Sequence, residues 1–214
     1  MDDFIEYVKS EYSDYGPQHS ASFTANASEL SLKQTSSEIG YRCKKSDQSK
    51  LVIVTTMGFS FHQMRPYESW DIFHREARRL WDIYRSVVKP EYIQRLGLRY
   101  TNKIVIPEDH VNISDYLNVG VTVPEAFLPI FKQYSVQMAL NIGGECRLTA
   151  VVQSGNAIPD IPDTVALVLD IDMSQSEDVS QNDSDIWSTL DIMRERKNII
   201  FEGCITPQSR ELFK

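Results

Sequence analysis

The chain has 214 residues, of which 42% are hydrophobic and 24% charged, and its formal net charge is −8. This composition is typical of a globular protein with one substantial core, and the negative charge argues against general affinity for nucleic acid. No segment approaches the roughly 18 consecutive apolar residues that span a bilayer, and the acidic N-terminus lacks a secretory signal, so we expect a cytoplasmic protein without membrane contact.

Cysteine usage and the distribution of charge add two constraints. Cys43, Cys146 and Cys204 are odd in number and widely separated, which indicates reduced thiols and no zinc or redox motif, so we predict no cofactor. Residues 65–103 hold nine basic and five acidic side chains, whereas residues 104–193 hold two basic and fourteen acidic ones. A basic centre in an acidic chain indicates either a binding surface or two segments that pair with each other.

The N-terminal third predicts one helix and one hairpin. A helix over residues 2–12 places Phe4, Ile5 and Val8 on one face. Residues 18–37 are rich in Ser, Thr, Ala and Asn and are either a surface strand with loops or partly mobile. Residues 1–36, the first helix and this Ser/Thr/Ala-rich connection, are therefore expected to be peripheral. Two apolar segments, 40–43 and 51–56, flank a turn and predict a hairpin, whose second strand is expected to continue to Met64.

A long amphipathic helix is predicted behind Ser69, whose hydroxyl can accept an orphan backbone N–H. Its apolar residues recur with a period near 3.5 and require one buried face: Trp70, Phe73, Ala77, Leu80, Tyr84 and Val87. Pro90 ends the helix. Residues 93–106 then alternate as a strand, with Leu96, Leu98, Tyr100, Ile104 and Ile106 on one face and Arg95, Gly97, Arg99, Thr101 and Lys103 on the other. Asn102 falls on the apolar side and needs hydrogen-bond partners there.

The remaining sequence predicts short helical pieces at 114–117 and 124–131, a hairpin of 134–142 and 145–153 around Gly143-Gly144, a strand over 164–173, a helix over about 184–198, and a short helix beginning at Pro207. Hairpin connections and long helices indicate the α+β class. We predict a single domain, 1–214, with a largely antiparallel sheet of about six strands and two long amphipathic helices packed on one face.

The basic strand is the first candidate binding site. Arg95, Arg99 and Lys103 recur every four residues, so they could form a ladder for phosphates, with Tyr92 or Tyr100 nearby for stacking. Tyr100 and Asn102 are therefore included among the candidate binding residues. Alternatively, the cations pair with Asp170 and Asp172 on a neighbouring strand, since opposite charges across strands attract. We favour the internal pairing because acidic residues are in excess elsewhere in the chain.

Asp170 and Asp172 are also the candidate metal ligands, because they share a strand face and carboxylate oxygens suit Mg²⁺. Such a site usually needs a third carboxylate, and no adjacent motif supplies one. No nucleophile elbow, phosphate-binding Gly-rich loop, dinucleotide fingerprint or zinc-protease helix occurs, so no catalytic residue is predicted.

Four segments together resemble a sporadically distributed prokaryotic family of unknown function: Pro66-Tyr-Glu-Ser-Trp-Asp, Arg95-Leu-Gly-Leu-Arg-Tyr-Thr-Asn, Leu169-Asp-Ile-Asp and Lys197-Asn-Ile-Ile-Phe-Glu-Gly-Cys-Ile-Thr. The resemblance covers roughly residues 40–213 and supplies no catalytic residues. Patchy distribution is common among defence and toxin–antitoxin genes. Members of the family usually begin with an apolar strand, which this chain lacks before its first helix, and a missing strand would leave a sheet edge open to a partner or a second copy.

The leading functional hypothesis is therefore a non-catalytic binding or regulatory module, antitoxin-like or defence-associated, that contacts another protein or a second copy through an open sheet edge. The alternative is a nucleic-acid-binding protein or metal-dependent nuclease that uses Arg95, Arg99 and Lys103 with Asp170 and Asp172. A small-molecule pocket between sheet and helices is a third possibility.

Overall fold

The computed structural model describes residues 2–26, 31–120, 133–144 and 146–213, with no account of the side chains of 22–34. The chain forms two compact units, Met1–Glu91 and Tyr92–Lys214. Each has its own antiparallel sheet and long helix. Since the two units are placed independently, the prediction of a single domain over 1–214 stays a prediction.

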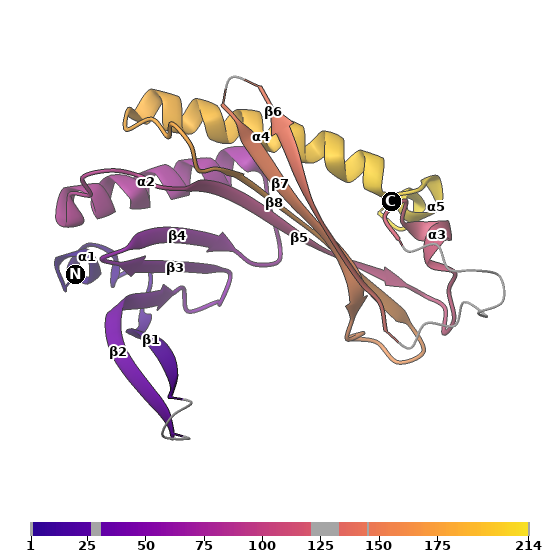
Figure 1. The fold of residues 1–214 in the computed structure, drawn as a ribbon, viewed down its shortest axis with the longest axis horizontal. Helices are drawn as coiled ribbons and strands as arrows, with labels where there is room; N and C mark the ends of the chain where they lie inside the picture. The colour runs from indigo at the N-terminus through magenta and orange to yellow at the C-terminus, as the bar shows by residue number, and fades with distance from the viewer. Residues whose placement is uncertain (1, 27–30, 121–132, 145, 214) are drawn as a thin grey trace. The chain divides into compact units, whose positions relative to one another are not determined.

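The first unit is a four-stranded sheet covered on one face by two helices (Figure 1). Its elements, in chain order, are α1 (Asp2–Val8), β1 (Asp14–Asn26), β2 (Ser31–Lys44), β3 (Lys50–Thr55), β4 (Gly58–Gln63) and α2 (Trp70–Val88). The strands lie in the order β1-β2-β3-β4, and every neighbouring pair is antiparallel. The core is formed by one face of the sheet and the two helices, through Phe4, Ile5, Val8, Tyr12, Cys43, Val52, Val54, Leu80 and Tyr84.

Helix α2 confirms the predicted amphipathic segment. The backbone N–H of Ile72 donates to the Ser69 hydroxyl at 3.3 Å, so Ser69 caps the helix as expected. The apolar stripe packs on β4, where the Phe59 ring lies 5.7 Å from Trp81 and 5.6 Å from Tyr84, centroid to centroid. Aromatic pairs at such distances stabilise the packing of the helix beyond what the buried apolar area alone contributes.

The strand predicted to continue from residue 51 to Met64 is wrong, because the chain reverses after Thr55. The Thr55 hydroxyl accepts from the backbone N–H of Met57 at 3.1 Å and donates to the carbonyl of Gly58 at 3.2 Å. These local bonds close a tight turn between Thr55 and Gly58, which pair across the β3–β4 hairpin. Phe59 and Phe61 therefore belong to a separate antiparallel strand, β4.

The polar segment 18–37 also differs from the prediction, since most of it forms the two longest strands of the first unit. Strand β1 pairs with β2 from Asp14↔Lys44 to Asn26↔Ser31, with one bulge between Gln18 and His19. This segment is rich in Ser, Thr and Ala and lacks apolar alternation, so the hairpin is hidden from a hydrophobicity pattern. The predicted hairpin of β2 and β3 is confirmed.

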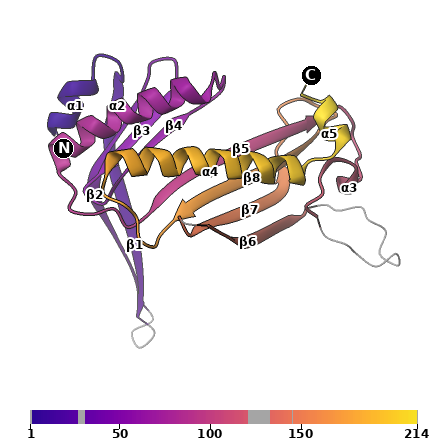
Figure 2. The ribbon, with the colours of Figure 1, turned by 90° about the horizontal axis from the view of Figure 1, so that it is seen from above.

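The second unit is a four-stranded sheet with one long helix along one face (Figure 2). Its elements are β5 (Leu96–Ile106), α3 (Ile113–Tyr116), β6 (Ser135–Gly143), β7 (Leu148–Ala157), β8 (Val165–Gln175), α4 (Asp183–Cys204) and α5 (Pro207–Glu211). The strand order is β5-β8-β7-β6. The sheet and α4 bury a common set of apolar side chains that includes Leu167, Leu169, Ile171, Met173, Ile186, Leu190 and Met193.

The α+β class and the antiparallel pairing are confirmed, but the count of six strands in one sheet is wrong, because eight strands form two sheets of four among the described residues. The long helices do not share one sheet face; each belongs to a different unit. The hairpin of β6 and β7 is confirmed, and both Gly143 and Gly144 have positive φ, 67° and 77°. The predicted two-residue turn is wrong, because Gly143 still pairs with Leu148 and β7 begins only at Leu148. The helical piece predicted at 124–131 lies outside the described residues.

Candidate functional site

The register of β5 against β8 brings the basic row beside the two aspartates. Arg99 lies directly opposite Asp172, and Thr101 lies opposite Asp170. Since alternate residues of a strand share a face, these four side chains lie on the same side of the sheet. This charged side of the sheet is opposite to the apolar face that α4 covers.

Asp170 is the most buried charge of this face, with 8% of its side chain exposed. Its carboxylate accepts from Arg99 Nε at 3.0 Å and from Arg99 Nη2 at 2.7 Å. The Thr101 hydroxyl adds a third hydrogen bond at 2.8 Å. The bond to Asp170 and its negative charge raise the pKa of the Arg99 guanidinium. The buried carboxylate is thus both neutralised and hydrogen-bonded, which is what burial of a charge requires.

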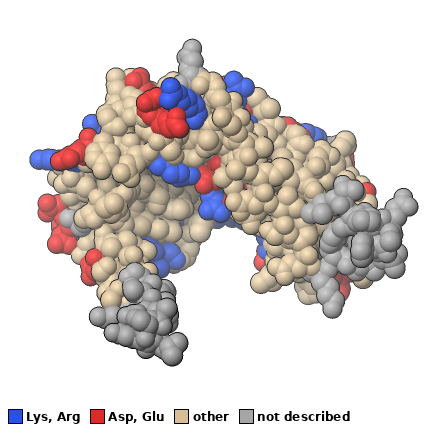
Figure 3. All heavy atoms as spheres, viewed as in Figure 1, with Lys and Arg blue, Asp and Glu red and all other residues tan. Residues whose placement is uncertain are grey.

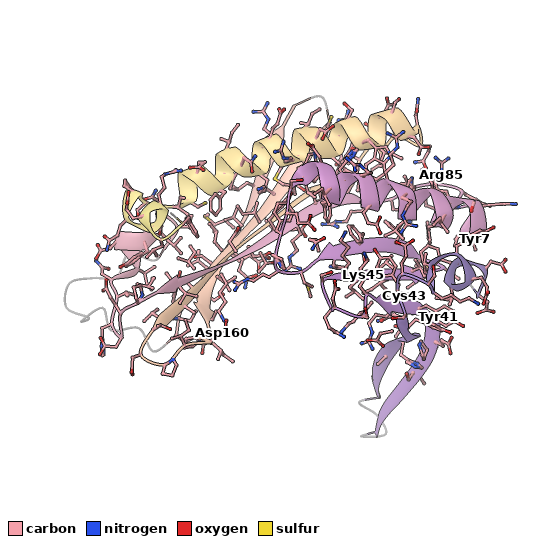
Figure 4. The ribbon with its side chains drawn as sticks, turned by 180° about the vertical axis from the view of Figure 1, so that it is seen from behind. Tyr7, Tyr41, Cys43, Lys45, Arg85 and Asp160 are labelled. Atoms are coloured by element: carbon pink, nitrogen blue, oxygen red, sulfur yellow. The ribbon has the colours of Figure 1, made fainter. Side chains whose placement is uncertain are left out.

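The other two cations of the row are paired as well. Arg95 Nη2 lies 2.9 Å from each carboxylate oxygen of Asp172, with 51% and 28% of the two side chains exposed. Lys103 Nζ lies 2.8 Å from Asp160, a residue of the β7–β8 loop that Figure 4 labels. The pairing prediction is confirmed for Arg95 and Arg99. Lys103 differs because its cross-strand neighbour on β8 is Val168, so its counter-ion comes from the loop.

These contacts define what the face can do chemically. A phosphate would have to displace a carboxylate from each guanidinium, and a metal ion would have to displace guanidinium groups from Asp170 and Asp172. Among the described residues, no group of three or more His, Cys, Asp or Glu side chains is placed to hold a metal ion. Acidic and basic side chains also lie side by side at several points of the surface drawn in Figure 3.

Tyr100 and Asn102, the other two predicted site residues, lie on the α4 side of the sheet, away from Arg95, Arg99 and Lys103. The Asn102 side-chain amide donates to the carbonyl of Leu169 at 3.1 Å, which satisfies the hydrogen-bond need that its apolar position predicted. The Tyr100 ring lies under Lys197 Nζ of α4, 3.8 Å from the ring centroid. The structure therefore does not bring the five predicted binding residues together on one surface.

Lys197 is a residue of interest that sequence reasoning missed. Burial, together with the charge of Arg194, lowers its pKa from 10.5 to about 8. A cation held over an aromatic ring gains a favourable interaction that offsets part of the desolvation. The sequence contained a clue to this residue. Lys197 continues the buried stripe of Ile186, Leu190 and Met193 at helical spacing, at a position where an apolar residue is expected.

Strand β6 is the second candidate surface, since it forms an edge of the second sheet. Its nine residues, SVQMALNIG, include no charged residue and no proline. Met138 and Leu140 are 36% and 37% exposed, on the face where α4 covers the neighbouring strands. Natural edge strands are usually protected by charge, proline or bulges, so an apolar edge that pairs with no further strand among the described residues is a feature to explain.

The direction of the free backbone groups on β6 follows from one hydrogen bond. The carbonyl of Tyr134 accepts from the N–H of Asn156 at 3.3 Å, in line with the β6–β7 register. In an antiparallel pair, residues whose N–H and C=O bond to the partner alternate with residues whose groups point away. Ser135, Gln137, Ala139 and Asn141 therefore direct their backbone groups outward.

Two open hollows lie in the first unit, around α1. One, of about 430 Å³, is lined by Asp3, Glu6, Tyr7, Ser86, Val87 and Lys89. The other, of about 190 Å³, includes Tyr15 and Tyr41, and the Tyr41 hydroxyl donates to Asp2 at 2.7 Å. Figure 4 labels Tyr7 and Tyr41. Ligand pockets are typically enclosed and mostly apolar, so these acidic, open hollows do not resemble one.

Comparisons of the chain with protein-family models, with curated proteins and with solved structures found no match. The resemblance to a prokaryotic family thus stays a prediction. None of the described helices combines the length and the apolar character needed to cross a membrane.

Proposed function

We propose that this chain is a protein-binding module whose second unit takes up an extended segment of another polypeptide along β6. The observation that carries the proposal is this edge, on which no further strand pairs within the part of the chain that the structure describes. Four residues with outward backbone groups alternate with exposed or half-buried apolar side chains along a strand without charge or proline. Strand addition of this kind draws affinity from main-chain hydrogen bonds and specificity from the alternating side chains.

The other sheet edges are protected by charge, proline or short length, whereas β6 has only a register shift near its end, between Asn141 and Gly143. Strand β5 has Arg99 and Lys103, β1 has Pro17 and a bulge at Gln18, and β4 is only six residues long. Each of these features discourages pairing with a further strand. The contrast within one chain supports β6 as the edge that is kept available.

The ion pairs on β5 support protein binding over the nucleic-acid alternative. Affinity for a polyanion comes mainly from cations that are free to replace counter-ions at phosphates. Each cation of the row, Arg95, Arg99 and Lys103, already lies within 2.9 Å of a carboxylate oxygen. The antitoxin-like or defence-associated role remains a further proposal, which a toxin-like nuclease or kinase encoded beside this gene would support.

A displayed library of random peptides, selected on the chain, tests the proposed function. The chain offers a matched pair of variants at one position: Ala139→Pro removes an outward N–H and adds a ring on the pairing side, whereas Ala139→Ser keeps the N–H. Because the Ala139 N–H points away from β7, neither change removes a bond inside the sheet. We expect selected peptides to bind wild type and Ala139→Ser equally and Ala139→Pro at least about tenfold more weakly, a loss near 1.4 kcal/mol. Peptides that bind all three equally, or no enrichment at all, would contradict the proposal.

A further inference from the structure

Strand β6 is complementary to itself when two copies run antiparallel. Its regular ladder with β7 extends from Ser135 to Asn141 and is followed by a register shift before Gly143. The middle of this stretch is Met138. If a twofold axis passes through Met138, Val136 lies opposite the second copy's Leu140 and Met138 lies opposite its own counterpart, so three exposed or half-buried apolar side chains of each copy meet on one face.

The hydrogen bonds agree with the same register. Around Met138, Gln137 lies opposite Ala139 of the second copy, and Ser135 lies opposite Asn141. All four are residues whose backbone groups point outward, as the Tyr134–Asn156 bond establishes. Each such pair exchanges two hydrogen bonds in an antiparallel ladder, so the register leaves none of the four unpaired. On the polar face, the side chains that meet are Gln with Ala and Ser with Asn.

The distribution of charge affects how strongly two β6 strands can pair. The strand itself carries no charge, so no like charges face each other across the new ladder. The second unit as a whole is acidic, with ten basic and seventeen acidic residues in 92–214. Two copies therefore repel at long range but not at the contact, and salt screens the repulsion while leaving the backbone bonds intact.

We propose that two copies of the chain join through β6 into one continuous eight-stranded antiparallel sheet with the twofold axis at Met138. This inference rests on the proposed function only in using the same open edge; it names a second copy of the chain as an occupant. Such a dimer closes both β6 edges, which is the usual advantage of pairing an exposed edge.

Disulfide trapping tests the register. In the background of Cys146→Ser, the remaining Cys43 and Cys204 are buried. Met138→Cys places two thiols opposite each other in a pair with Cα atoms about 4.5 Å apart, within the range that disulfides span. Ala139→Cys is the matched control, because residue 139 of one copy lies diagonally from residue 139 of the other, with the two about 7–8 Å apart. Under mild oxidation we expect the Met138→Cys protein to form a covalent dimer at least about tenfold faster than the control.

Sedimentation equilibrium of the full chain supplies the second measurement. Wild type and Ala139→Ser should dimerise with the same Kd, and the Kd should fall as salt rises. Ala139→Pro should remain monomeric at concentrations where Ala139→Ser is dimeric. A wild-type monomer throughout the micromolar range, equal trapping at residues 138 and 139, or a dimer unaffected by Ala139→Pro would each overturn the inference.

The two proposals fail separately. A monomeric chain whose selected peptides still depend on Ala139 would refute the dimer and retain the module for foreign strands. A dimer that depends on Ala139 but yields no selected peptides would show that the edge serves self-association alone.

Discussion

The contacts of Asp170 distinguish a phosphate-binding role of the basic strand β5 from internal pairing of its cations. Its carboxylate is almost fully buried and takes three hydrogen bonds from Arg99 and Thr101. A buried carboxylate with these partners holds the Arg99 guanidinium in place. Arg99 therefore stabilises the fold, and a ligand could bind it only by displacing Asp170. Asp172 and Arg95 make the same kind of pair in a more exposed setting.

The difference in burial predicts different costs for the two arginines. Arg99→Met leaves a buried carboxylate without its counter-charge and should lower the free energy of unfolding by about 1.5–3 kcal/mol. Arg95→Met removes a more solvated pair and should cost about 0–1 kcal/mol. Urea denaturation at neutral pH measures both. Equal, small costs would show that Asp170 does not depend on Arg99.

Lys197 predicts a pH-dependent stability. Its pKa in the folded chain is about 8, below the ordinary value of 10.5, so between these pH values the unfolded chain binds more protons. Stability contributed by this residue therefore rises with pH from about 8 to 10.5. Lys197→Met should melt higher than wild type at pH 7, and the gap should narrow towards pH 10. Arg196→Met, at an exposed position, is the control; a gap independent of pH would contradict the placement of Lys197.

At the scale of the element, the hydrogen bond of Tyr12 is the buried link between the segment after α1 and α2, beside the exposed pair of Glu11 and Arg79. The fully buried Tyr12 donates its hydroxyl to Glu76 at 2.7 Å, and Arg79 donates to the same carboxylate at 2.9 Å. Burial pushes the pKa of Glu76 upward, but the hydrogen bonds from Arg79 and Tyr12 and the charge of Arg79 together lower it. The carboxylate therefore stays ionised to lower pH in the folded chain than in the unfolded one.

Tyr12→Phe tests this connection. It should lower the free energy of unfolding by about 1.5–3 kcal/mol at pH 7, because Glu76 loses a donor that cannot be replaced from buried surroundings. Since the folded pKa of Glu76 is lowered, the stabilisation is present above the ordinary pKa of 4.5 and is lost as pH falls through the folded value. The penalty of Tyr12→Phe should accordingly shrink below pH 4.5. Tyr15→Phe, at a position 49% exposed, should cost no more than about 0.5 kcal/mol.

Elements with a buried apolar face could be predicted from the sequence, and polar ones could not. Helix α2 and the hairpin around Gly143-Gly144 follow from periodicity and turn chemistry. The β1–β2 hairpin escaped because its segment 18–37 is rich in Ser, Thr and Ala and shows no apolar alternation. The turn at Thr55 escaped because a threonine hydroxyl closes it, a bond that the pattern of apolar residues does not encode.

The candidate site shows the same division. The face shared by Arg95, Arg99 and Lys103 could be predicted from alternation, and their pairing with acidic residues from the charge distribution. That Lys103 meets Asp160 depends on the path of the β7–β8 loop, and the availability of β6 depends on strand order. Neither loop path nor strand order is a local property of the sequence.

At the scale of the whole molecule, the net charge of −8 is unevenly divided. Residues 1–91 hold twelve basic and thirteen acidic residues, so almost the entire surplus belongs to the second unit, which also carries the basic row and the β6 edge. An acidic unit whose basic row is internally paired repels polyanions. The uncharged edge strand β6 can still pair with another polypeptide strand, because backbone hydrogen bonds do not depend on net charge. Both properties favour a polypeptide as the bound partner.

Titration of a fluorescent single-stranded oligonucleotide with the chain at low salt, followed by anisotropy, separates the two functional classes most directly. With Arg95, Arg99 and Lys103 held by Asp172, Asp170 and Asp160, we predict no saturable rise in anisotropy for RNA or DNA. Saturable binding that weakens with added salt and disappears in the Arg95→Met and Arg99→Met variants would contradict the internal pairing and the protein-binding role built on it.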